Sequence, residues 1–304
     1  MIKLKDTGER LIPELHKQSL AFGEHLARYH AAKDLAKDRV VLDIASGAGY
    51  GSAFLAQTAK KVIGVDYDRT AVAYSKELYP LKNVEFRVGD AQLLPLEDSS
   101  VDVVVSLETI EHIPNPEKMV KEVVRVLKPN GIFYVSTPND EEFIEGNEFH
   151  LHEFDFAELS KLINKYFKQA QYYYQGTWYA SGVLNKKNFE GSSTPLSATK
   201  TFNQRTDKAI YFLSVATNGP VMPKLTENIV ASDRFSELTA QKQHEERISS
   251  DALKIKRIDE LVGESKTLKA EIYRLNKELG DILNSRSWKM IQKVDLVKRK
   301  IKRT

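Results

Sequence analysis

The sequence contains no cysteine, and it has no uninterrupted apolar run of the roughly 18 residues that mark a membrane-spanning helix. The first absence excludes disulfide bonds and thiolate chemistry, and it is compatible with a reducing compartment. The opening residues, MIKLKDTGER, also lack the apolar region of a secretory signal. We therefore expect a cytoplasmic protein, peripheral at most at the inner face of the membrane.

A glycine-rich turn follows the first strongly apolar segment. Residues 40–51 have the sequence VVLDIASGAGYG, in which an apolar strand is followed by glycines at positions 47, 49 and 51. Glycine lets the backbone approach a ligand closely, and the unpaired N–H groups at a helix start favour anionic or oxygen-rich groups. The turn therefore predicts a nucleotide-type pocket.

Acidic residues accompany three successive strands of this region. Asp43 lies inside the first strand, Asp66 ends the second and Asp90 follows the third. A dinucleotide site would need Gly-x-Gly-x-x-Gly, but Ser52 occupies the third glycine position. Strands alternate with helices here, which predicts a parallel sheet with right-handed crossovers.

The strand, its acid and the glycine turn together resemble the first motif of the class I S-adenosylmethionine (SAM)-dependent methyltransferases, with Ala45 at the place of the first glycine. In that family Asp43 would balance the cationic end of SAM, Asp66 would hold the ribose and Asp90 would accept a hydrogen bond from adenine. The resemblance implies SAM as cofactor and twelve binding residues near the turn and the strand ends: Arg28, Asp43, Ala45, Ser46, Gly47, Gly49, Asp66, Tyr67, Asp90, Ala91, Leu107 and Glu108.

The segment before the first strand has two interpretations. TGERLIPE followed by HLARY resembles the opening of a methyltransferase group that modifies O-antigen and other bacterial glycans. By that resemblance residues 1–38 cap the SAM pocket, and Arg28 is the candidate partner of the cofactor carboxylate. The alternative is a plain helix that covers the edge of the sheet.

The segment LETIEHI supplies two candidate catalytic residues. It resembles the family loop that lies over the transferred methyl group, so Glu111 and His112 are expected to face either the pocket or solvent. For His112 the alternative is a loop histidine bonded to the backbone. Proton removal from a hydroxyl acceptor would need a base, whereas a phosphate or carboxylate acceptor would need none.

The segment NEFHLHEFDF, residues 147–156, adds His150 and His152 beyond a strand end. It resembles an Asn-Pro-Phe-His stretch of the glycan methyltransferases, with Glu148 in place of proline. Neither cysteine nor an acid cluster supports metal ligation by the two histidines, so no metal is expected. The candidate catalytic residues are therefore His150 or His112 as base, with Glu111 as the orienting partner.

Two interleaved seven-residue series follow the catalytic part. Positions 258, 265, 272 and 279 and positions 261, 268, 275 and 282 are apolar except for Ser265. This pattern predicts a coiled coil over residues 258–283, most simply a parallel homodimer. A helix folded back on the domain is the alternative, since short coils are marginal alone.

The positive charge is concentrated at the end of the chain. Residues 286–304 carry eight Lys or Arg against one acid, Asp295, although the whole chain has a net charge of only +3. With Trp288 and regularly spaced apolar residues, this tail predicts a basic amphipathic helix on anionic lipid. A solvated tail or a docking site for a glycosyltransferase is the alternative; nucleic acid is disfavoured because one aromatic provides no stacking series.

The expected architecture is an α/β, Rossmann-like, seven-stranded and mostly parallel sheet with helices on both faces, an antiparallel last strand and a C-terminal coiled coil. We assign residues 1–218 to the methyltransferase domain with a mobile loop or substrate lid at 186–207, 219–232 to a linker, 233–285 to the helical segment and 286–304 to the basic tail.

Three functions are compatible with these features. The leading one is O-methylation of a bacterial surface polysaccharide or its lipid-linked precursor. The others are methylation of a small molecule or quinone, and a non-catalytic SAM-binding scaffold assembled through the coil.

Overall fold

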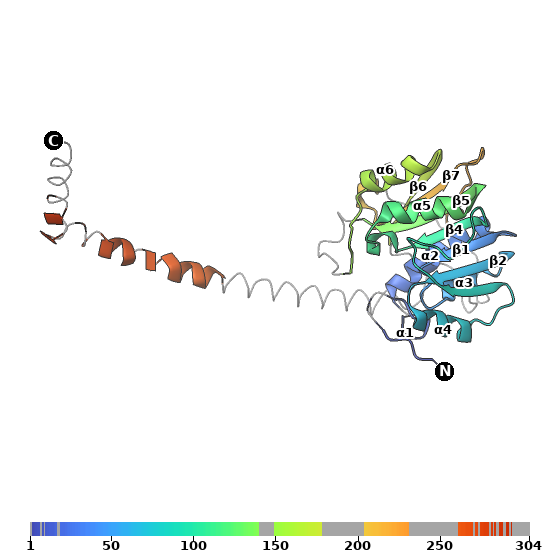
Figure 1. Ribbon diagram of the computed structural model, residues 1–304, viewed down its shortest axis with the longest axis horizontal. Helices are drawn as coiled ribbons and strands as arrows, with labels where there is room; N and C mark the ends of the chain where they lie inside the picture. The colour runs from blue at the N-terminus through green and yellow to red at the C-terminus, as the bar shows by residue number, and fades with distance from the viewer. Residues whose placement is uncertain are drawn as a thin grey trace, which may run out of the picture. The chain divides into compact units, whose positions relative to one another are not determined.

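Seven strands form one sheet in the order β3-β2-β1-β4-β5-β7-β6 (Figure 1). Strands β1 to β5 are parallel, and β7 runs antiparallel to both of its neighbours, β5 and β6. The expected mixed seven-stranded sheet is thereby confirmed. The strands are β1 (Val40–Ile44), β2 (Lys61–Asp66), β3 (Val84–Val88), β4 (Val101–Leu107), β5 (Leu127–Pro138), β6 (Gln169–Gln175) and β7 (Tyr211–Thr217).

The computed structural model describes residues 2–6, 8, 10–16, 19–139, 149–177 and 204–230, and in addition 261–269, 271, 272, 274–279, 281, 283, 286, 287, 290, 291 and 293. The chain divides into two units, Met1–Ser236 and Glu237–Thr304. Among the described residues, no helix is both long enough and apolar enough to cross a membrane.

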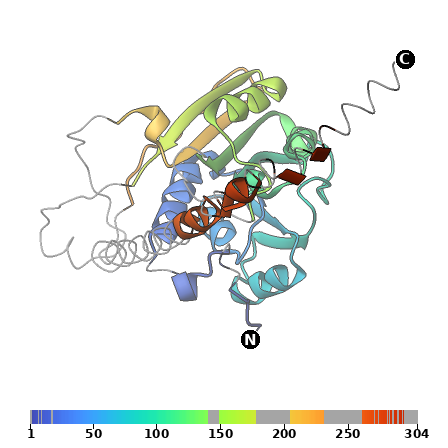
Figure 2. The same ribbon diagram turned by 90° about the vertical axis from the view of Figure 1, so that its left-hand side faces the viewer.

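Helices cover both faces of the sheet in the first unit (Figure 2). Helices α5 and α6 pack on one face through Met119 and Ile163, while α2 and α3 pack on the other through Leu35 and Leu55. The described helices of this unit are α1 (Pro13–His16), α2 (Leu20–Ala36), α3 (Tyr50–Leu55), α4 (Arg69–Leu78), the 3-10 helix η1 (Ile110–His112), α5 (Pro116–Val126), α6 (Phe156–Tyr166) and the 3-10 helix η3 (Thr206–Lys208).

The central strand β4 shows why the sheet is covered on both sides. Its sequence VDVVVSL is a nearly continuous apolar run, and Val103 and Val105 join the core on one face while Val104 joins the core on the other. Successive side chains of a strand point to opposite faces, so such a run is stable only between two apolar layers.

Side-chain caps fix the helix starts. Asp68, Asn115 and Asp155 each accept a hydrogen bond from a backbone N–H in the first turn of α4, α5 and α6, respectively. Such caps pair N–H groups that have no partner within the helix. The Asp155 cap starts α6 at Phe156.

Part of the expected linker 219–232 packs on the first unit. Leu225 is buried, and its N–H donates to the Tyr173 hydroxyl at 3.1 Å. The Asn228 side chain donates to the Ala27 carbonyl of α2 at 3.1 Å. The chain thus stays bound to the domain through residue 228. Of the expected mobile loop 186–207, residues 186–203 lie outside the described residues.

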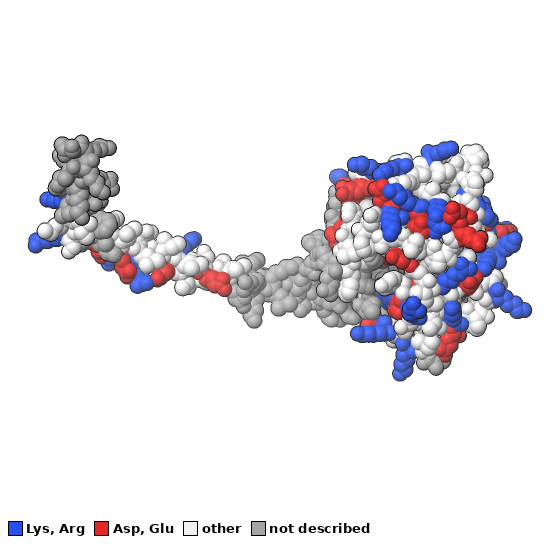
Figure 3. Space-filling model, viewed as in Figure 1, with Lys and Arg blue, Asp and Glu red and all other residues white. Residues whose placement is uncertain are grey.

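The described residues of the second unit are helical. Their apolar side chains in the two seven-residue series are exposed: Leu261, Leu268, Ile272, Leu275 and Leu279. Pairing of two such helices stays a prediction. Trp288 and residues 294–304 of the basic tail lie outside the described residues. On the face of the first unit that Figure 3 shows, Lys and Arg alternate with Asp and Glu.

Candidate active site

The candidate residues gather at the carboxyl ends of the parallel strands. The strand order reverses between β1 and β4, which are parallel neighbours in the sheet. The glycine turn follows β1, Asp66 ends β2, Asp90 follows β3 and Glu108 follows β4. Open α/β sheets bind ligands at such a point.

The glycine turn has a strained backbone. Ala45, Gly47 and Gly49 have φ angles of +55°, +54° and +82°, in the left-handed region that side chains disfavour. A Cβ atom on Gly49 would lie 2.6 Å from the Ser75 hydroxyl oxygen, so this glycine is required for packing. A Cβ on Gly47 would meet nothing closer than the Arg10 side chain, at 3.7 Å. A Cβ atom at Gly47 would thus make ordinary contact with the Arg10 side chain, which covers this part of the turn.

Asp66 is oriented by backbone N–H groups. Its Oδ2 accepts from Gly47 N at 2.7 Å, and its Oδ1 accepts from Asp68 N at 2.9 Å. Arg10 lies against the same carboxylate, with Nη2 3.8 Å from Asp66 Oδ1, and it donates to Asp68 at 2.9 Å. The neighbouring Tyr67 is 82% exposed. We did not assign Arg10 from the sequence, although it belongs to the segment TGERLIPE.

Asp43 lies behind the glycine turn. Its side chain is buried, and its two oxygens accept hydrogen bonds from Ser52 Oγ at 2.6 Å and from the Tyr29 hydroxyl at 3.4 Å. Burial raises the pKa of Asp43 to about 7, against the effect of these two hydrogen bonds. The carboxyl group thus joins the turn to α2 and α3.

Arg28 of α2 is almost wholly buried, with 1% of its surface exposed. Its Nη1 donates to Gln175 of β6 at 2.8 Å and lies 3.8 Å from Glu108 Oε1, while the guanidinium stacks 4.3 Å from the centroid of the Tyr211 ring. Among the described residues, Nε and Nη2 have no hydrogen-bond partner. The sequence did not predict Gln175 and Tyr211 as partners of Arg28. They lie 147 and 183 residues further along the chain, and no local sequence signal links them to this arginine.

Glu108, whose Oε1 lies near Nη1 of this arginine, is held in place by β5. Its backbone has a positive φ of +48°, and its Oε1 accepts from the Ser136 hydroxyl of β5 at 2.5 Å. Leu107, directly before it, is buried. Asp90 accepts from the N–H of Gln92 at 2.7 Å, and Ala91 packs partly against the core.

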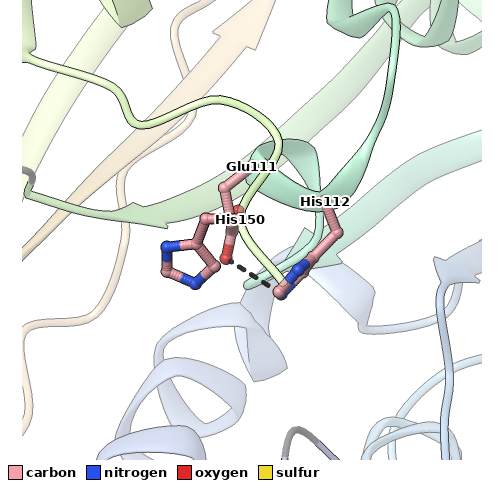
Figure 4. A group of neighbouring side chains, drawn as sticks. All are labelled: Glu111, His112 and His150. Atoms are coloured by element: carbon pink, nitrogen blue, oxygen red, sulfur yellow. Dashed lines mark ion pairs between the residues drawn. The ribbon is translucent and has the colours of Figure 1, made fainter. Parts of the chain in front are cut away.

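Glu111, His112 and His150 form a second cluster (Figure 4). One ligand atom from each lies within 4.8 Å of those of the other two. Glu111 is 1% exposed, and burial, together with the charge of Glu108, raises its pKa. Its Oε2 accepts from Thr137, whereas Oε1 has no hydrogen-bond partner among the described residues and lies 3.8 Å from His112 Nε2.

Backbone contacts bring His150 to this cluster. The N–H groups of Leu151 and His152 donate to the carbonyl of Glu111 at 2.9 and 3.0 Å, which fixes the segment after β5 against η1. The rings of His112 and His150 lie 4.9 Å apart at 71°. His152 lies apart from this cluster, against Glu158 and the Phe154 ring.

Residues 42–135 match the family described as Methyltransferase domain. This part of the chain is thus similar to a methyltransferase domain. A probable S-adenosylmethionine-dependent methyltransferase of Mycolicibacterium smegmatis is 42% identical over 162 residues, which cover 52% of this chain and 62% of that protein. The phthiotriol/phenolphthiotriol dimycocerosates methyltransferase of Mycobacterium tuberculosis is 33% identical over 124 residues, 38% of this chain and 46% of that protein.

A solved structure has the same fold as the methyltransferase domain. The PH0226 protein of Pyrococcus horikoshii aligns with a TM-score of 0.50 and 21% identity, over 70% of this chain and 99% of its own. The chain matches less than two thirds of the length of the two curated relatives.

SAM is the cofactor of this methyltransferase domain. Two features of the site fit it. Among the described residues, Nε and Nη2 of buried Arg28 have no acceptor, and the carboxylate of SAM would provide one. The turn after β1, with Gly47 and Gly49 at positive φ, is of the glycine-rich kind that lets a ligand approach the backbone closely.

Proposed function

We propose that the protein is a SAM-dependent O-methyltransferase that acts on a bacterial surface polysaccharide or its lipid-linked precursor. The observation that carries this proposal is the pair of histidines, His112 and His150, beside the buried Glu111 at the ligand-binding edge of a methyltransferase sheet. A hydroxyl acceptor needs a nearby group that accepts its proton, and these histidines provide one.

The cofactor would be held by four parts of the site. Arg28 would bind its carboxylate, and Asp43 would contribute negative charge behind the cationic end. Gly47 and Asp66 would meet the ribose, and Asp90 would accept from the adenine amino group. The remaining proposed contacts come from the same loops: Ala45, Ser46, Gly49, Tyr67, Ala91, Leu107 and Glu108.

When bound, SAM supplies a methyl group that an acceptor oxygen displaces from sulfur. The protein mainly has to align the acceptor, because this is an in-line displacement at near-contact distance. His150 or His112 would take the hydroxyl proton. Glu111 would orient the base, since its Oε1, which has no hydrogen-bond partner among the described residues, lies 3.8 Å from His112 Nε2.

The acceptor class is supported by the resemblance of TGERLIPE and HLARY to glycan methyltransferases. A small-molecule acceptor is the second candidate, and the match to a relative named for phthiotriol and phenolphthiotriol dimycocerosates supports it.

We further propose that residues 258–283 pair two copies, and that residues 286–304 attach the dimer to anionic lipid or to a glycosyltransferase at the cytoplasmic face of the membrane.

Turnover and cell-surface chemistry test the proposal together. Purified protein should convert SAM to S-adenosylhomocysteine only when a glycan acceptor is present. Surface polysaccharide from cells lacking this gene should lose one methyl ether by mass spectrometry. Unchanged polysaccharide, with turnover on a small molecule, would support the second candidate. SAM binding without turnover on any acceptor would support the scaffold.

The base is tested by His150→Ala, with His152→Ala as the matched control two residues away. We expect turnover to fall by two or more orders of magnitude, because general-base catalysis contributes about 10² to 10⁴, while SAM affinity is unchanged. The control should keep its turnover. Near-normal turnover of His150→Ala would instead assign the base to His112 or indicate an acceptor that needs none.

A further inference from the structure

We propose that Glu111, His112 and His150 bind one divalent transition-metal ion of the Zn²⁺ type. Each residue offers one ligand atom, and the three atoms lie within 4.8 Å of one another (Figure 4). The sequence alone predicted no metal, because neither cysteine nor an acid cluster accompanies His150 and His152. The fold brings His150 to Glu111 and His112 instead.

The distances suit an ion after a small movement. Ligand atoms of a tetrahedral zinc site lie about 3.3 Å apart, given metal–ligand bonds of about 2.0 to 2.1 Å. His112 Nε2 and Glu111 Oε1 lie 3.8 Å apart. An approach of about half an ångström would bring these two atoms into coordination distance of one ion, and the third ligand atom, within 4.8 Å of them, would need to move by up to about 1.5 Å.

The donor set is chemically specific. One carboxylate with two imidazoles is the protein ligand set of open zinc sites and of non-haem iron(II) sites, which keep positions for water or substrate. Hard ions such as Mg²⁺ prefer oxygen ligands and suit this set less well. Glu111 is buried, whereas the side chains of His112 and His150 are 29% and 10% exposed, which leaves the ion a path from solvent.

Contacts around the cluster orient the ligand atoms. His112 Nδ1 lies 2.9 Å from the carbonyl oxygen of Phe149, which only accepts hydrogen bonds. Nδ1 therefore carries the proton, and the lone pair of Nε2 is on the side of Glu111. Thr137 donates to Glu111 Oε2, which leaves Oε1 for the ion. His150 Nδ1 similarly lies 3.6 Å from Glu153.

A bound cation would also stabilise Glu111, whose environment is unfavourable for a charged carboxylate. A buried carboxylate oxygen without a hydrogen bond is costly, because neither water nor protein replaces its lost hydration. Glu111 Oε1 is such an atom among the described residues, and it is directed toward the two imidazoles. A bound ion would satisfy this oxygen.

The role of the ion, though not its binding, rests on the proposed function. A hydroxyl at an open position of the ion would have a lowered pKa and would lose its proton to water. In the metal-loaded protein the imidazoles would then be ligands and not bases. Removal of the metal would lower turnover to the level that the freed imidazoles support as bases, without weakening SAM binding.

The test uses the full-length chain, freed of metal by a chelator and titrated with Zn²⁺ alone by calorimetry, then with Co²⁺ by visible absorption. We expect one equivalent of either ion per chain and Co²⁺ bands typical of mixed nitrogen and oxygen ligands. His150→Ala and Glu111→Gln should each lower Zn²⁺ affinity at least 10- to 100-fold, the range that loss of a mere supporting contact already produces. His152→Ala should bind as the unmodified protein does.

Absence of Zn²⁺ binding by the unmodified protein would overturn the inference, as would unchanged affinity in His150→Ala. An equal loss in His152→Ala would also overturn it, since that residue lies outside the cluster. Because Glu111 is buried, circular dichroism must show that Glu111→Gln is folded. His150 is partly exposed, so His150→Ala tests the site even if Glu111→Gln does not fold. SAM titration separates the two proposals: a protein that binds SAM but not Zn²⁺ keeps the proposed function without the metal site.

Discussion

At the scale of single residues, the site is defined by buried charges that the protein only partly neutralises. Arg28 has two unpartnered nitrogens, and Glu111 has one unpartnered oxygen among the described residues. Asp43 and Asp66, in contrast, have both oxygens engaged by hydroxyl or backbone donors. The first pair therefore needs a bound partner, and the second pair shapes the turn that receives it.

Asp66→Ala should weaken SAM binding while the protein stays folded. A carboxylate bound to two ribose hydroxyls makes charge-assisted hydrogen bonds, whose loss costs on the order of 2 to 3 kcal/mol, or roughly a hundredfold in affinity. Calorimetric titration with SAM measures this directly. Asp98→Ala is the control, because Asp98 is exposed and pairs only with Arg125 in the described structure. Equal affinities for the two variants would reject the assignment of Asp66.

Asp43 should make the protein less stable as the pH rises from 4 to 7. Its pKa is raised from 3.8 to about 7 by burial, so in this window the folded state binds a proton that the unfolded state has lost. Stability from this group is fully present below about pH 4 and is lost as the pH approaches 7, at up to about 1.4 kcal/mol per pH unit.

Asp43→Asn isolates this effect, because asparagine does not titrate and other acids titrate equally in both proteins. Urea unfolding at pH 4 to 7 should show the stability of the original protein falling relative to that of the variant. A constant difference across this range would contradict the raised pKa. The opposite slope would mean that the hydrogen bonds from Ser52 and Tyr29 outweigh burial.

At the scale of secondary structure, the cofactor turn depends on how closely α3 packs on α2. Gly51 lies in the first turn of α3, where a Cβ atom would be 1.9 Å from Tyr29 Cζ of α2. The same tyrosine donates to Asp43 of β1. One ring thus sets the spacing of two helices and a strand around the glycine turn.

Gly51→Ala should destabilise the domain although alanine is the better helix former. The gain of about 1 kcal/mol in helix propensity is outweighed by overpacking, which typically costs about 1 to 3 kcal/mol, and the clash here is with a buried ring. Urea unfolding measures the net loss. Tyr29→Leu removes the clashing atoms, so the double variant should lose less than the sum of the single changes. If the losses of stability are additive, the contact between position 51 and the Tyr29 ring is not what destabilises Gly51→Ala.

At the scale of the whole molecule, the chain combines a methyltransferase unit with a second, helical unit. The described helical residues of the second unit expose apolar side chains at positions that repeat every seven residues, such as Leu268 and Leu275. Exposed apolar series of this period are typical of helices that pair. The basic tail of the sequence follows directly, so pairing would present two tails together.

Truncation after residue 230 should give a soluble monomer that binds SAM and does not sediment with anionic vesicles. The cut lies beyond Asn228, the last residue seen to bond to the domain, so the core is preserved. Analytical ultracentrifugation and low-salt vesicle sedimentation measure the two properties. A dimer after truncation would assign pairing to the methyltransferase unit.

Replacing both Leu268 and Leu275 with Lys should abolish dimerisation and weaken vesicle binding nearly as much as truncation does. Two tails on one dimer attach bivalently, and this gain exceeds the electrostatic gain from the added lysines. The control, Gly263→Lys with Thr267→Lys, adds the same charge outside the apolar series. Stronger vesicle binding by the leucine variant would show that charge alone governs attachment.

The sequence by itself determined the elements and the cofactor turn. The strand and glycine turn within residues 40–51, the strand that ends at Asp66 and the strand that Asp90 follows occur where the apolar pattern and the glycines predicted them. These features are local, because strand and helix periods, caps and turns depend on residues a few positions apart. The resemblance to class I methyltransferases, carried by the same local motif, was likewise confirmed.

Only the tertiary structure decided which side chains meet. Strand β7 lies between β5 and β6, which brings Tyr211 over Arg28, and the segment after β5 folds onto η1, which brings His150 to Glu111. No residue pattern near Arg28 or Glu111 in the sequence predicts these partners. Residues that are 38 to 183 positions apart in the sequence meet because of the order and packing of whole strands and helices. The spacing of apolar residues along the chain does not encode that order.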